Sequence, residues 1–457
     1  MTSELQATVD PGRLNQLYQE ETERFVAARP RSRELFERAR RHLPGGVPMS
    51  WMVKWPGPYP VFVEHAEGAH FTCVDGIDHV DLCLGDTGAM SGHSPAATVA
   101  TVREQVGRGI TAMLPTADAA MAAEELTRRF GVPMWQFTLS ATDCNRHLLR
   151  YARLVTGRPK VLVVDYCYHG TVDETFATLD EQGRVMARRG NLGPPVPPEH
   201  TTAVVEFNDV DGLAAALARE DVACALLEPA MTNIGIVLPE PGYHQALREL
   251  AERHGTLLII DETHTLCAGP GGCTAAWDLR PDAVVVGKTI GGGIPAAAFG
   301  MTEDFTERIA AAVPPEDVDV GGIGGTLAGN ALSLAAVRAT LTEVLTDEAF
   351  TRMEALAIDW TAGVQGVLDA TGAPWHVTRL GCRAEYAFSP QPPRTGAEAA
   401  GADDFALQQY LHLQALNRGV LLTPFHNMAL MCPATTRADV DAHTEAFEQA
   451  AQALFGA

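Results

Sequence analysis

The stretch Asp282-Ala-Val-Val-Val-Gly-Lys288, followed by Thr289-Ile-Gly-Gly-Gly293, is the most informative part of the chain. Its apolar run predicts a buried strand, and the glycines after it predict a turn. A lysine at that junction is costly unless its amine is used, because burying a charged amine without a partner is unfavourable. The strand holds the amine in one direction, and the glycines let a flat ligand approach closely. A Schiff base between Lys288 and a carbonyl cofactor fits this setting.

The same residues do not form a phosphate-binding P-loop, although Gly287-Lys288-Thr289 looks like the end of the motif G-x-x-x-x-G-K-[ST]. That motif requires glycine at position 282, where this chain has Asp282, and its glycines precede the lysine instead of following it. Nucleotide hydrolysis is therefore not expected.

The composition is that of an ordinary globular enzyme. The chain has 457 residues, of which 46% are hydrophobic and 20% charged, and this length is enough for two or more domains. A formal net charge of −23 argues against binding to nucleic acid or anionic membranes, and no apolar stretch approaches a membrane span. The first residues lack the features of a signal peptide. Nine cysteines without a C-x-x-C pair indicate neither a disulfide framework nor a metal site, so we expect a cytoplasmic protein.

Both ends of the chain are predicted to form smaller structures. Residues 11–43 have the pattern of two helices broken near Pro30, and three short strand patterns follow, with Asp75-Gly76 as a hairpin turn. Together they predict an N-terminal region, 1–90, with a helical arm and a small β-meander. The segment 336–457 has the pattern of helices and strands expected of a smaller α+β domain.

Residues 91–335 are predicted to form a large α/β domain, in which helical patterns alternate with continuous apolar runs typical of a mostly parallel sheet covered by helices. Four of these runs are followed by polar residues, namely Asp165, Glu228, Asp261 and Lys288. Ligands of open α/β sheets bind beyond the carboxyl ends of the strands. These four positions therefore predict a site.

Three further features suit a phosphorylated pyridine cofactor. Asp261 can pair with a protonated ring nitrogen. Ser140-Ala141-Thr142 opens a helical pattern and can offer free backbone N–H groups to a phosphate, while Tyr168, just past a strand, can stack on the ring. Taken singly, each is better interpreted structurally: Asp261 as a strand-end cap, the Ser140 segment as an ordinary N-cap and Tyr168 as a core tyrosine. Their occurrence together favours the cofactor site.

Taken in the order in which they occur along the chain, these motifs resemble the class III, fold-type I pyridoxal-phosphate aminotransferases. Within that family they resemble the glutamate-1-semialdehyde aminomutase and β-amino-acid transaminase branch. The resemblance covers roughly residues 40 to 430, and the motifs are highly specific only as a set. The matching stretches are Leu43-Pro-Gly-Gly46, Gly92-His93-Ser-Pro95, Tyr168-His-Gly170, Glu228-Pro229, Ile260-Asp-Glu262, Gly287-Lys288 with Ile290-Gly-Gly-Gly293, and Gly325-Thr326 with Gly329-Asn330. The resemblance implies an α/β fold with a large, mostly parallel sheet and a smaller α+β domain built from the N- and C-terminal segments.

The resemblance also implies pyridoxal 5'-phosphate as the cofactor and a role for each matching position. Lys288 would form the Schiff base and shuttle protons, Asp261 would hold the ring nitrogen, and Tyr168 and Thr263 would lie near the two faces of the ring. The family is dimeric with its active site at the interface, so a homodimer is implied. The other implied cofactor contacts are Ser140, Ala141, Thr142, Glu228 and, from the partner subunit, Thr326.

Two motifs depart from the family's pattern. The phosphate loop, usually Ser-Gly-Thr-Glu-Ala, is here Ser140-Ala141-Thr142-Asp143-Cys144, so a methyl group is added where backbone meets phosphate. The family's Asp-Glu-Val becomes Asp261-Glu262-Thr263, which brings a hydroxyl near the ring.

Both arginines with which such relatives grip a substrate carboxylate are missing. One expected position falls near Met52, and the other falls in the late strand and loop after Arg418, where no Lys or Arg occurs until Arg437. The pocket is therefore either largely apolar, lined by Trp51, Met52, Trp55 and Phe425, or it uses another cation.

Lys54 is the first candidate for that cation, since it shares a face with Met52 if the segment is extended, and His426 is the weaker one. A solvated Lys54 is an equally good interpretation. Asp86 stands roughly where relatives place an aromatic side chain. It would disfavour anionic substrates and favour a second amine, unless it caps a turn.

The leading hypothesis is a homodimeric transaminase that moves an amino group between an amine, either a hydrophobic primary amine or a β-amino acid, and a ketone, aldehyde or oxo-acid acceptor. The alternative is an intramolecular aminomutase or racemase on the same scaffold. A non-catalytic, cofactor-bound regulatory domain is disfavoured, because the cofactor motifs are nearly complete and no DNA-binding appendage is evident.

Overall fold

The computed structural model describes residues 9–313 and 322–456, and the chain divides into two compact units. The larger unit comprises residues 95–347 and 393–401, and the smaller one contains the rest. The sequence analysis placed the boundaries near residues 90 and 335, and it did not separate the short segment 393–401 from the smaller domain.

The larger unit is built on a seven-stranded sheet in the order β4-β12-β11-β10-β9-β5-β8. Only β12 runs antiparallel to its neighbours, and the fully buried β9, β10 and β11 form its centre. The predicted α/β class with a mostly parallel sheet is confirmed. The strands are β4 (Met134–Thr138), β5 (Lys160–Val164), β8 (Thr202–Val205), β9 (Val222–Leu227), β10 (Leu257–Asp261), β11 (Ala283–Val286) and β12 (Ala297–Met301).

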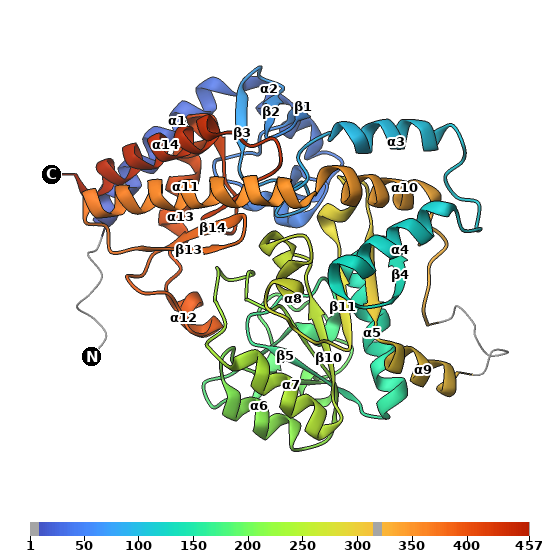
Figure 1. The fold of residues 1–457 in the computed structure, drawn as a ribbon. Coiled ribbons are helices and arrows are strands. Elements are labelled where there is room, and N and C mark those ends of the chain that lie inside the picture. The colour runs from blue at the N-terminus through green and yellow to red at the C-terminus, as the bar shows by residue number, and fades with distance from the viewer. Residues whose placement is uncertain (1–8, 314–321, 457) are drawn as a thin grey trace. The chain divides into compact units, whose positions relative to one another are not determined.

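Helices cover both faces of this sheet (Figure 1). α5 (Ala141–Thr156) lies on the face to which Asp261 points, because its Asn145 side chain donates a hydrogen bond to that carboxylate. α7 (Tyr243–His254) lies on the other face, where it lines a hollow with Leu258 and Ile260, whose side chains alternate with that of Asp261.

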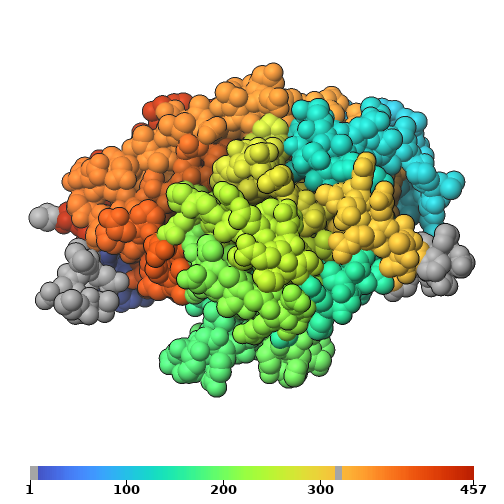
Figure 2. All heavy atoms as spheres, turned by 60° about the horizontal axis from the view of Figure 1, so that its bottom comes forward, coloured from blue at the N-terminus to red at the C-terminus, as the bar shows by residue number. Residues whose placement is uncertain are grey.

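The remaining elements of the larger unit surround this core. Residues of α6 and α7 (green) form part of its outer surface in Figure 2. The elements are α3 (Ala96–Val106), α4 (Ala117–Phe130), α6 (Val210–Leu217), α8 (Gly272–Ala276), α9 (Glu303–Ala312), α10 (Ala331–Ala339), α12 (Gly396–Gly401) and the hairpin of β6 (Ala177–Leu179) with β7 (Val185–Ala187).

The smaller unit joins both ends of the chain. β15 (Val420–Leu421) pairs with β3 (Asp78–Asp81), which continues the antiparallel sheet of β1 (Val63–Glu67) and β2 (His70–Cys73). This confirms that N- and C-terminal segments share one smaller domain. Its other elements are α1 (Pro11–Ala28), α2 (Pro30–Ala39), α11 (Asp347–Thr371), β13 (His376–Leu380), β14 (Arg383–Ala387), α13 (Phe405–Asn417), β16 (Met428–Leu430) and α14 (Arg437–Phe455). None of the helices in the described parts of the chain is long and apolar enough to cross a membrane.

The expected break near Pro30 and the expected turn at Asp75-Gly76 are held together by one side chain. The Asp75 carboxylate accepts the backbone N–H groups of Arg31 at 2.7 Å and Ser32 at 3.1 Å, and also the Ser32 hydroxyl at 2.5 Å. These N–H groups belong to the first turn of α2 and have no partner within the helix. The hairpin turn therefore caps the second helix.

Replacement of this cap should be measurable as lost stability. Asp75→Ala should lower the free energy of unfolding by about 1–2 kcal/mol, because two backbone donors lose their acceptor. Urea unfolding followed by tryptophan fluorescence measures the loss. Glu37→Ala, on the same helix and in an exposed pair with Arg40, is the control and should stay within about 0.5 kcal/mol of the parent. Equal effects of the two substitutions would contradict the capping role.

Candidate active site

The polar residues predicted at strand ends meet at one edge of the large sheet. β9, β10 and β11 are parallel neighbours, so Glu228, Asp261 and Lys288 lie side by side where these strands end. Glu228 and Asp261 are buried and Lys288 is half-buried. The carboxylates of Glu228 and Asp261 and the amine of Lys288 therefore belong to the same edge of the sheet.

Asp261 is held by donors from three directions. Its Oδ2 accepts hydrogen bonds from the Asn145 side chain at 3.0 Å and from His169 Nδ1 at 2.9 Å, and its Oδ1 accepts the N–H of Thr263 at 3.1 Å. A carboxylate has about four acceptor positions, and these contacts occupy three of them. One position on Oδ1 is left for a ring N–H, which is the contact that a pyridinium nitrogen requires.

These donors also keep Asp261 ionised. Burial alone would raise the pKa of Asp261, but the hydrogen bond and positive charge of His169, with the hydrogen bonds from Thr263 and Asn145, lower it to about 2. Burial would likewise lower the pKa of His169, but interactions with Cys167 and the hydrogen bond to Asp261 raise it to about 10. A fixed negative charge at this depth favours a protonated ring nitrogen.

Lys288 adopts an unusual backbone conformation for its position. It begins the short helical turn Lys288–Gly291 with φ of 52°, in the left-handed region that residues with a side chain rarely enter. A Cβ on the preceding Gly287 would lie 3.2 Å from Ala141 Cβ, so the end of β11 is packed against the start of α5. The strand end that carries Lys288 therefore lies beside the first turn of that helix.

The predicted phosphate loop forms the N-terminus of α5. Ser140 is its N-cap and accepts the Asp143 N–H at 3.3 Å, while the Thr142 hydroxyl accepts the Thr171 N–H at 3.1 Å. Gly170, with φ of 75°, lets this turn approach, because a Cβ there would lie 3.0 Å from Thr142 Cα. The first-turn N–H groups of a helix suit a phosphate, so the loop and Asp261 together fit a phosphorylated pyridine.

Tyr168 and Thr263 have surroundings compatible with their predicted roles against the ring. Tyr168 is 40% exposed and meets Phe176 edge-on, with ring centroids 6.2 Å apart. The Thr263 hydroxyl is buried and makes no hydrogen bond within the described structure. Stacking by Tyr168 and contact by Thr263 remain predictions.

Asp165, the fourth strand-end residue, has a structural role. Its carboxylate accepts the Thr178 hydroxyl at 2.6 Å and the Leu179 N–H at 3.3 Å. It thereby anchors the β6 strand to the end of β5. A part of Asp165 in the site remains a prediction.

The six predicted substrate residues all belong to the smaller unit, where several of them cluster. The Phe425 ring lies 5.9 Å from the Trp51 ring and 5.0 Å below the Lys54 amine. The segment Ser50–Lys54 is a 3₁₀ helix, so the extended conformation assumed for Met52 and Lys54 is wrong. Side chains two positions apart on such a helix do not share a face.

The other two candidates are tied into the smaller unit. His426 Nδ1 lies 3.4 Å from a Glu385 oxygen, and both residues are buried, so His426 already faces a carboxylate. Asp86 has φ of 49° and its N–H binds the Cys83 carbonyl at 3.0 Å, which places it in a tight turn. Contact of these residues with a substrate remains a prediction.

Thr326 lines a hollow of about 1020 Å³ within the larger unit. The hollow is also lined by Arg150 of α5 and by Met113 and Leu114, which are 81% and 74% exposed. Thr326 itself is exposed. This position is compatible with the predicted contact to a second subunit.

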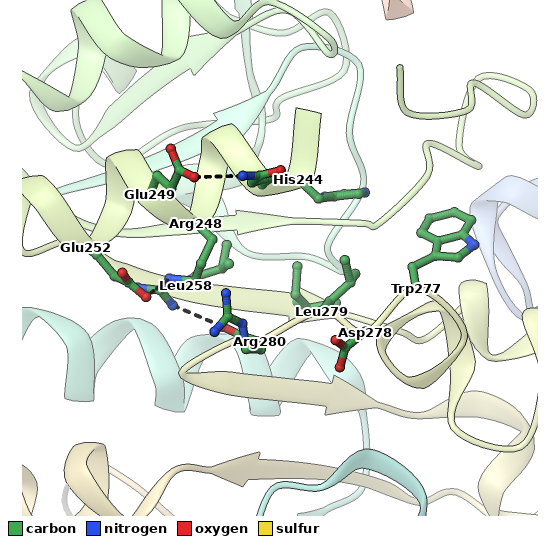
Figure 3. A pocket seen from close by; sticks show the side chains of 11 residues that line it. His244, Arg248, Glu249, Glu252, Leu258, Trp277, Asp278, Leu279 and Arg280 are labelled. Carbon is green, nitrogen blue, oxygen red and sulfur yellow. Dashed lines mark hydrogen bonds and ion pairs between the residues drawn. The ribbon is translucent and has the colours of Figure 1, made fainter. Parts of the chain in front are cut away.

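A smaller hollow of about 360 Å³, drawn in Figure 3, lies on the face of the sheet opposite to the one to which Asp261 points. Leu258 and Ile260 of β10 line it, so Asp261 points away from it. Its arginine Arg248 is paired with Glu252 at 3.1 Å and Asp282 at 2.9 Å. The cofactor site is therefore not in this hollow.

Four residues at the strand ends were not predicted, namely Asn145, His169, Thr232 and His264. His169 and His264 stand next to the predicted Tyr168 and Thr263, and a polar residue just past a buried strand is the signal that marked those neighbours. Asn145 comes from a helix and Thr232 from a loop. Only the packing shows that their side chains reach the edge of the sheet.

Comparison with known proteins places these features in a family context. The profile of the aminotransferase class-III family matches residues 52–451. A glutamate-1-semialdehyde 2,1-aminomutase of Nitratidesulfovibrio vulgaris is 34% identical over 430 residues, which are 93% of this chain and 98% of that protein.

Solved structures give the same picture. A glutamate-1-semialdehyde-aminomutase from Pseudomonas aeruginosa is 48% identical, with a TM-score of 0.95 over 98% of this chain and 99% of that one. A lysine-to-alanine variant of such an enzyme from that organism was solved in complex with PMP. A β-phenylalanine aminotransferase from Variovorax paradoxus is 27% identical, with a TM-score of 0.84 over 95% of this chain and 97% of that one.

The Asp261–His169 pair predicts a particular dependence of stability on pH. The raised pKa of His169 stabilises the fold fully below about pH 6.5, and this contribution is lost as pH rises toward about 10. The lowered pKa of Asp261 adds stability above about pH 3.8 that is lost toward about pH 2. In cofactor-free protein, His169→Gln should therefore lower the free energy of unfolding by about 1.5–3 kcal/mol near pH 6 and by less at pH 9.

Urea unfolding at a series of pH values measures this difference. His147→Gln is the control, because burial lowers the pKa of His147, so its effect should be constant above about pH 7. A loss in His169→Gln that is the same at pH 6 and pH 9 would show that no charged pair exists.

Proposed function

The chain belongs to the class-III aminotransferases and uses pyridoxal 5'-phosphate, and from that premise we propose that it is an intramolecular aminomutase. It would move an amino group between adjacent carbons of one small substrate, as the name glutamate-1-semialdehyde 2,1-aminomutase describes for its relatives. The observation that carries this proposal is the similarity to the Pseudomonas aeruginosa aminomutase, which extends over nearly the whole chain and well exceeds that to the transaminase. It favours the alternative of the sequence analysis over its leading hypothesis.

The residues at the sheet edge have separate chemical roles in this proposal. When bound, pyridoxal phosphate supplies an electron sink that stabilises negative charge on a substrate carbon. Asp261, kept ionised by His169 and Asn145, keeps the ring nitrogen protonated. The first turn of α5 holds the phosphate through backbone N–H groups. Lys288 Nζ provides the amine that binds the cofactor carbonyl and then carries protons to and from the substrate carbons.

An intermolecular transaminase is the second candidate, and a pair of aromatic side chains among the predicted substrate residues favours it. Trp51 and Phe425 meet in the smaller unit, with Lys54 above the Phe425 ring. An apolar pair of this kind suits a hydrophobic amine, and a nearby ammonium group suits a carboxylate such as that of a β-amino acid.

We further propose that the enzyme acts as a homodimer in which Thr326 of one subunit contacts the cofactor phosphate of the other. The exposure of Thr326, Met113 and Leu114 around one hollow supports this assembly, because exposed apolar side chains of this size are commonly covered in an interface.

A single-substrate experiment separates the two activities. The holoenzyme is supplied with glutamate 1-semialdehyde and no other acceptor, and the isomer formed is counted per active site. An aminomutase returns the amino group to the same molecule and should form many equivalents of the isomer, whereas a transaminase, for which the aldehyde of a second molecule can serve as acceptor, should form a diamine and a dicarbonyl compound instead of the isomer. Arylalkylamines and β-amino acids, each supplied alone and then with an oxo-acid acceptor, test the second candidate.

Lys288→Ala is the control for this experiment. It should lower turnover by about 100- to 10,000-fold, and borohydride should no longer attach the cofactor covalently to the protein. Lys160→Arg alters an ion pair with Asp221 at the start of β5. This variant should keep both the turnover and the covalent attachment of the cofactor by borohydride. Formation of the diamine and dicarbonyl compound instead of the isomer would overturn the aminomutase proposal, and covalent attachment to Lys288→Ala would overturn the role of Lys288.

The dimer proposal has its own test. Thr326→Ala should raise the Kd for pyridoxal phosphate by about tenfold, because one hydrogen bond to the phosphate is lost. Equilibrium dialysis measures the Kd, and analytical ultracentrifugation of the same samples measures assembly. Thr342→Ala, at an exposed helical threonine, is the control. A monomer that retains cofactor as tightly as the parent would contradict the proposal.

A further inference from the structure

A continuous chain of hydrogen bonds leads from Lys288 to Glu228. The Lys288 amine contacts His264 Nε2, and His264 Nδ1 lies 2.8 Å from the Thr232 hydroxyl. That hydroxyl binds one oxygen of Glu228, while the other oxygen accepts the Thr232 N–H at 3.4 Å. His264, Thr232 and Glu228 are all buried. The chain thus links the ends of β11, β10 and β9.

The chemistry of these groups gives the chain a direction. An ionised carboxylate only accepts hydrogen bonds, so the Thr232 hydroxyl donates its one proton to Glu228. The hydroxyl oxygen must then accept from His264, which places the imidazole proton on Nδ1. The opposite nitrogen, Nε2, is left with a lone pair that faces the Lys288 amine.

We propose that His264 is the base that takes a proton from the Lys288 ammonium group, and that Glu228, acting through Thr232, holds His264 in the required tautomer. The N–H bond of Lys288 breaks, the proton moves to Nε2, and the positive charge of the imidazolium is balanced by the Glu228 carboxylate. Lys288 is then a neutral amine with a lone pair. The inference rests on the proposed role of Lys288 as the reactive amine, and it makes His264 a catalytic residue and Glu228 a positioning residue.

The other titratable groups nearby are occupied elsewhere. Glu262 lies two residues before His264. Its carboxylate accepts hydrogen bonds from the hydroxyls of Thr265 at 2.5 Å and Thr274 at 2.6 Å, and burial raises its pKa. Burial and the neighbouring Glu262 also raise the pKa of Cys273. Asp261 is committed to His169, Asn145 and Thr263.

The proposal assigns Glu228 a role different from direct contact with the cofactor. Its carboxylate accepts both the hydroxyl and the N–H of Thr232, so this charge acts on Lys288 across two intervening side chains. A neutral substitute at Thr232 should therefore have an effect that resembles loss of the carboxylate.

The chain's small number of lysines permits a direct test on cofactor-free protein. Only Lys54, Lys160 and Lys288 occur, so acetic anhydride labelling followed by peptide mass spectrometry reports each amine separately. Since only the neutral amine reacts, the labelling rates at one pH, about pH 8, compare how much of each lysine is neutral. Lys288 should be labelled at least about tenfold faster than Lys160, which serves as the internal reference.

His264→Gln and Thr232→Val should each lower the labelling rate of Lys288 about tenfold at that pH. Thr274→Val removes a hydroxyl from Glu262 instead and is the matched control, with an unchanged labelling rate expected. The labelling rates of Lys54 and Lys160 should not change in any variant.

Each outcome is decisive. A parent protein in which Lys288 is labelled no faster than Lys160 overturns the proposal even if no variant folds. An unchanged labelling rate in His264→Gln overturns the role of His264, and an effect of His264→Gln without one of Thr232→Val overturns the role of Glu228. These results are independent of the proposed function, because turnover and covalent attachment of the cofactor are measured separately in the holoenzyme.

Discussion

The buried negative charge of Asp261 is the constraint on which the rest of the site depends. An ionised carboxylate at the centre of a covered sheet is unfavourable unless several donors face it. Asn145 from α5, His169 from the turn after β5 and the N–H of Thr263 meet this requirement. Each of these donors is thereby fixed in position, and with them the start of the phosphate-binding helix and the turn that carries Tyr168.

The same edge of the sheet holds two polar networks with different purposes. The network around Asp261 maintains a negative charge that favours a protonated ring nitrogen. The network from Glu228 through Thr232 and His264 ends on Lys288 and directs a lone pair toward its amine. One network therefore stabilises a proton on the cofactor side, and the other removes a proton from the lysine. Neighbouring parallel strands allow both to operate within one small region.

Much of this arrangement was predictable because it depends on short-range pattern. Continuous apolar runs indicated the central strands, Pro30 and Asp75-Gly76 marked breaks and turns, and polar residues at strand ends indicated the site. Short-range pattern did not show that the Asp165 carboxylate accepts hydrogen bonds from β6, or that Ser50–Lys54 forms a 3₁₀ helix. A polar residue past a strand indicates position but not the partner of its side chain.

By itself, the sequence determined the α/β class, the lysine and aspartate of the cofactor site, the helix that starts at Ser140 and the family to which the chain belongs. Those properties follow from periodicity and from motifs of a few adjacent residues. Only the tertiary structure decided that Asn145 and His169 hold Asp261, that His264 faces Lys288, and that Glu228 binds Thr232. The physical reason is that the contacts of Asp261 and Lys288 join residues far apart in the chain, which strand order and packing bring within hydrogen-bond distance, whereas the Glu228–Thr232 contact is local but depends on how the loop after β9 folds.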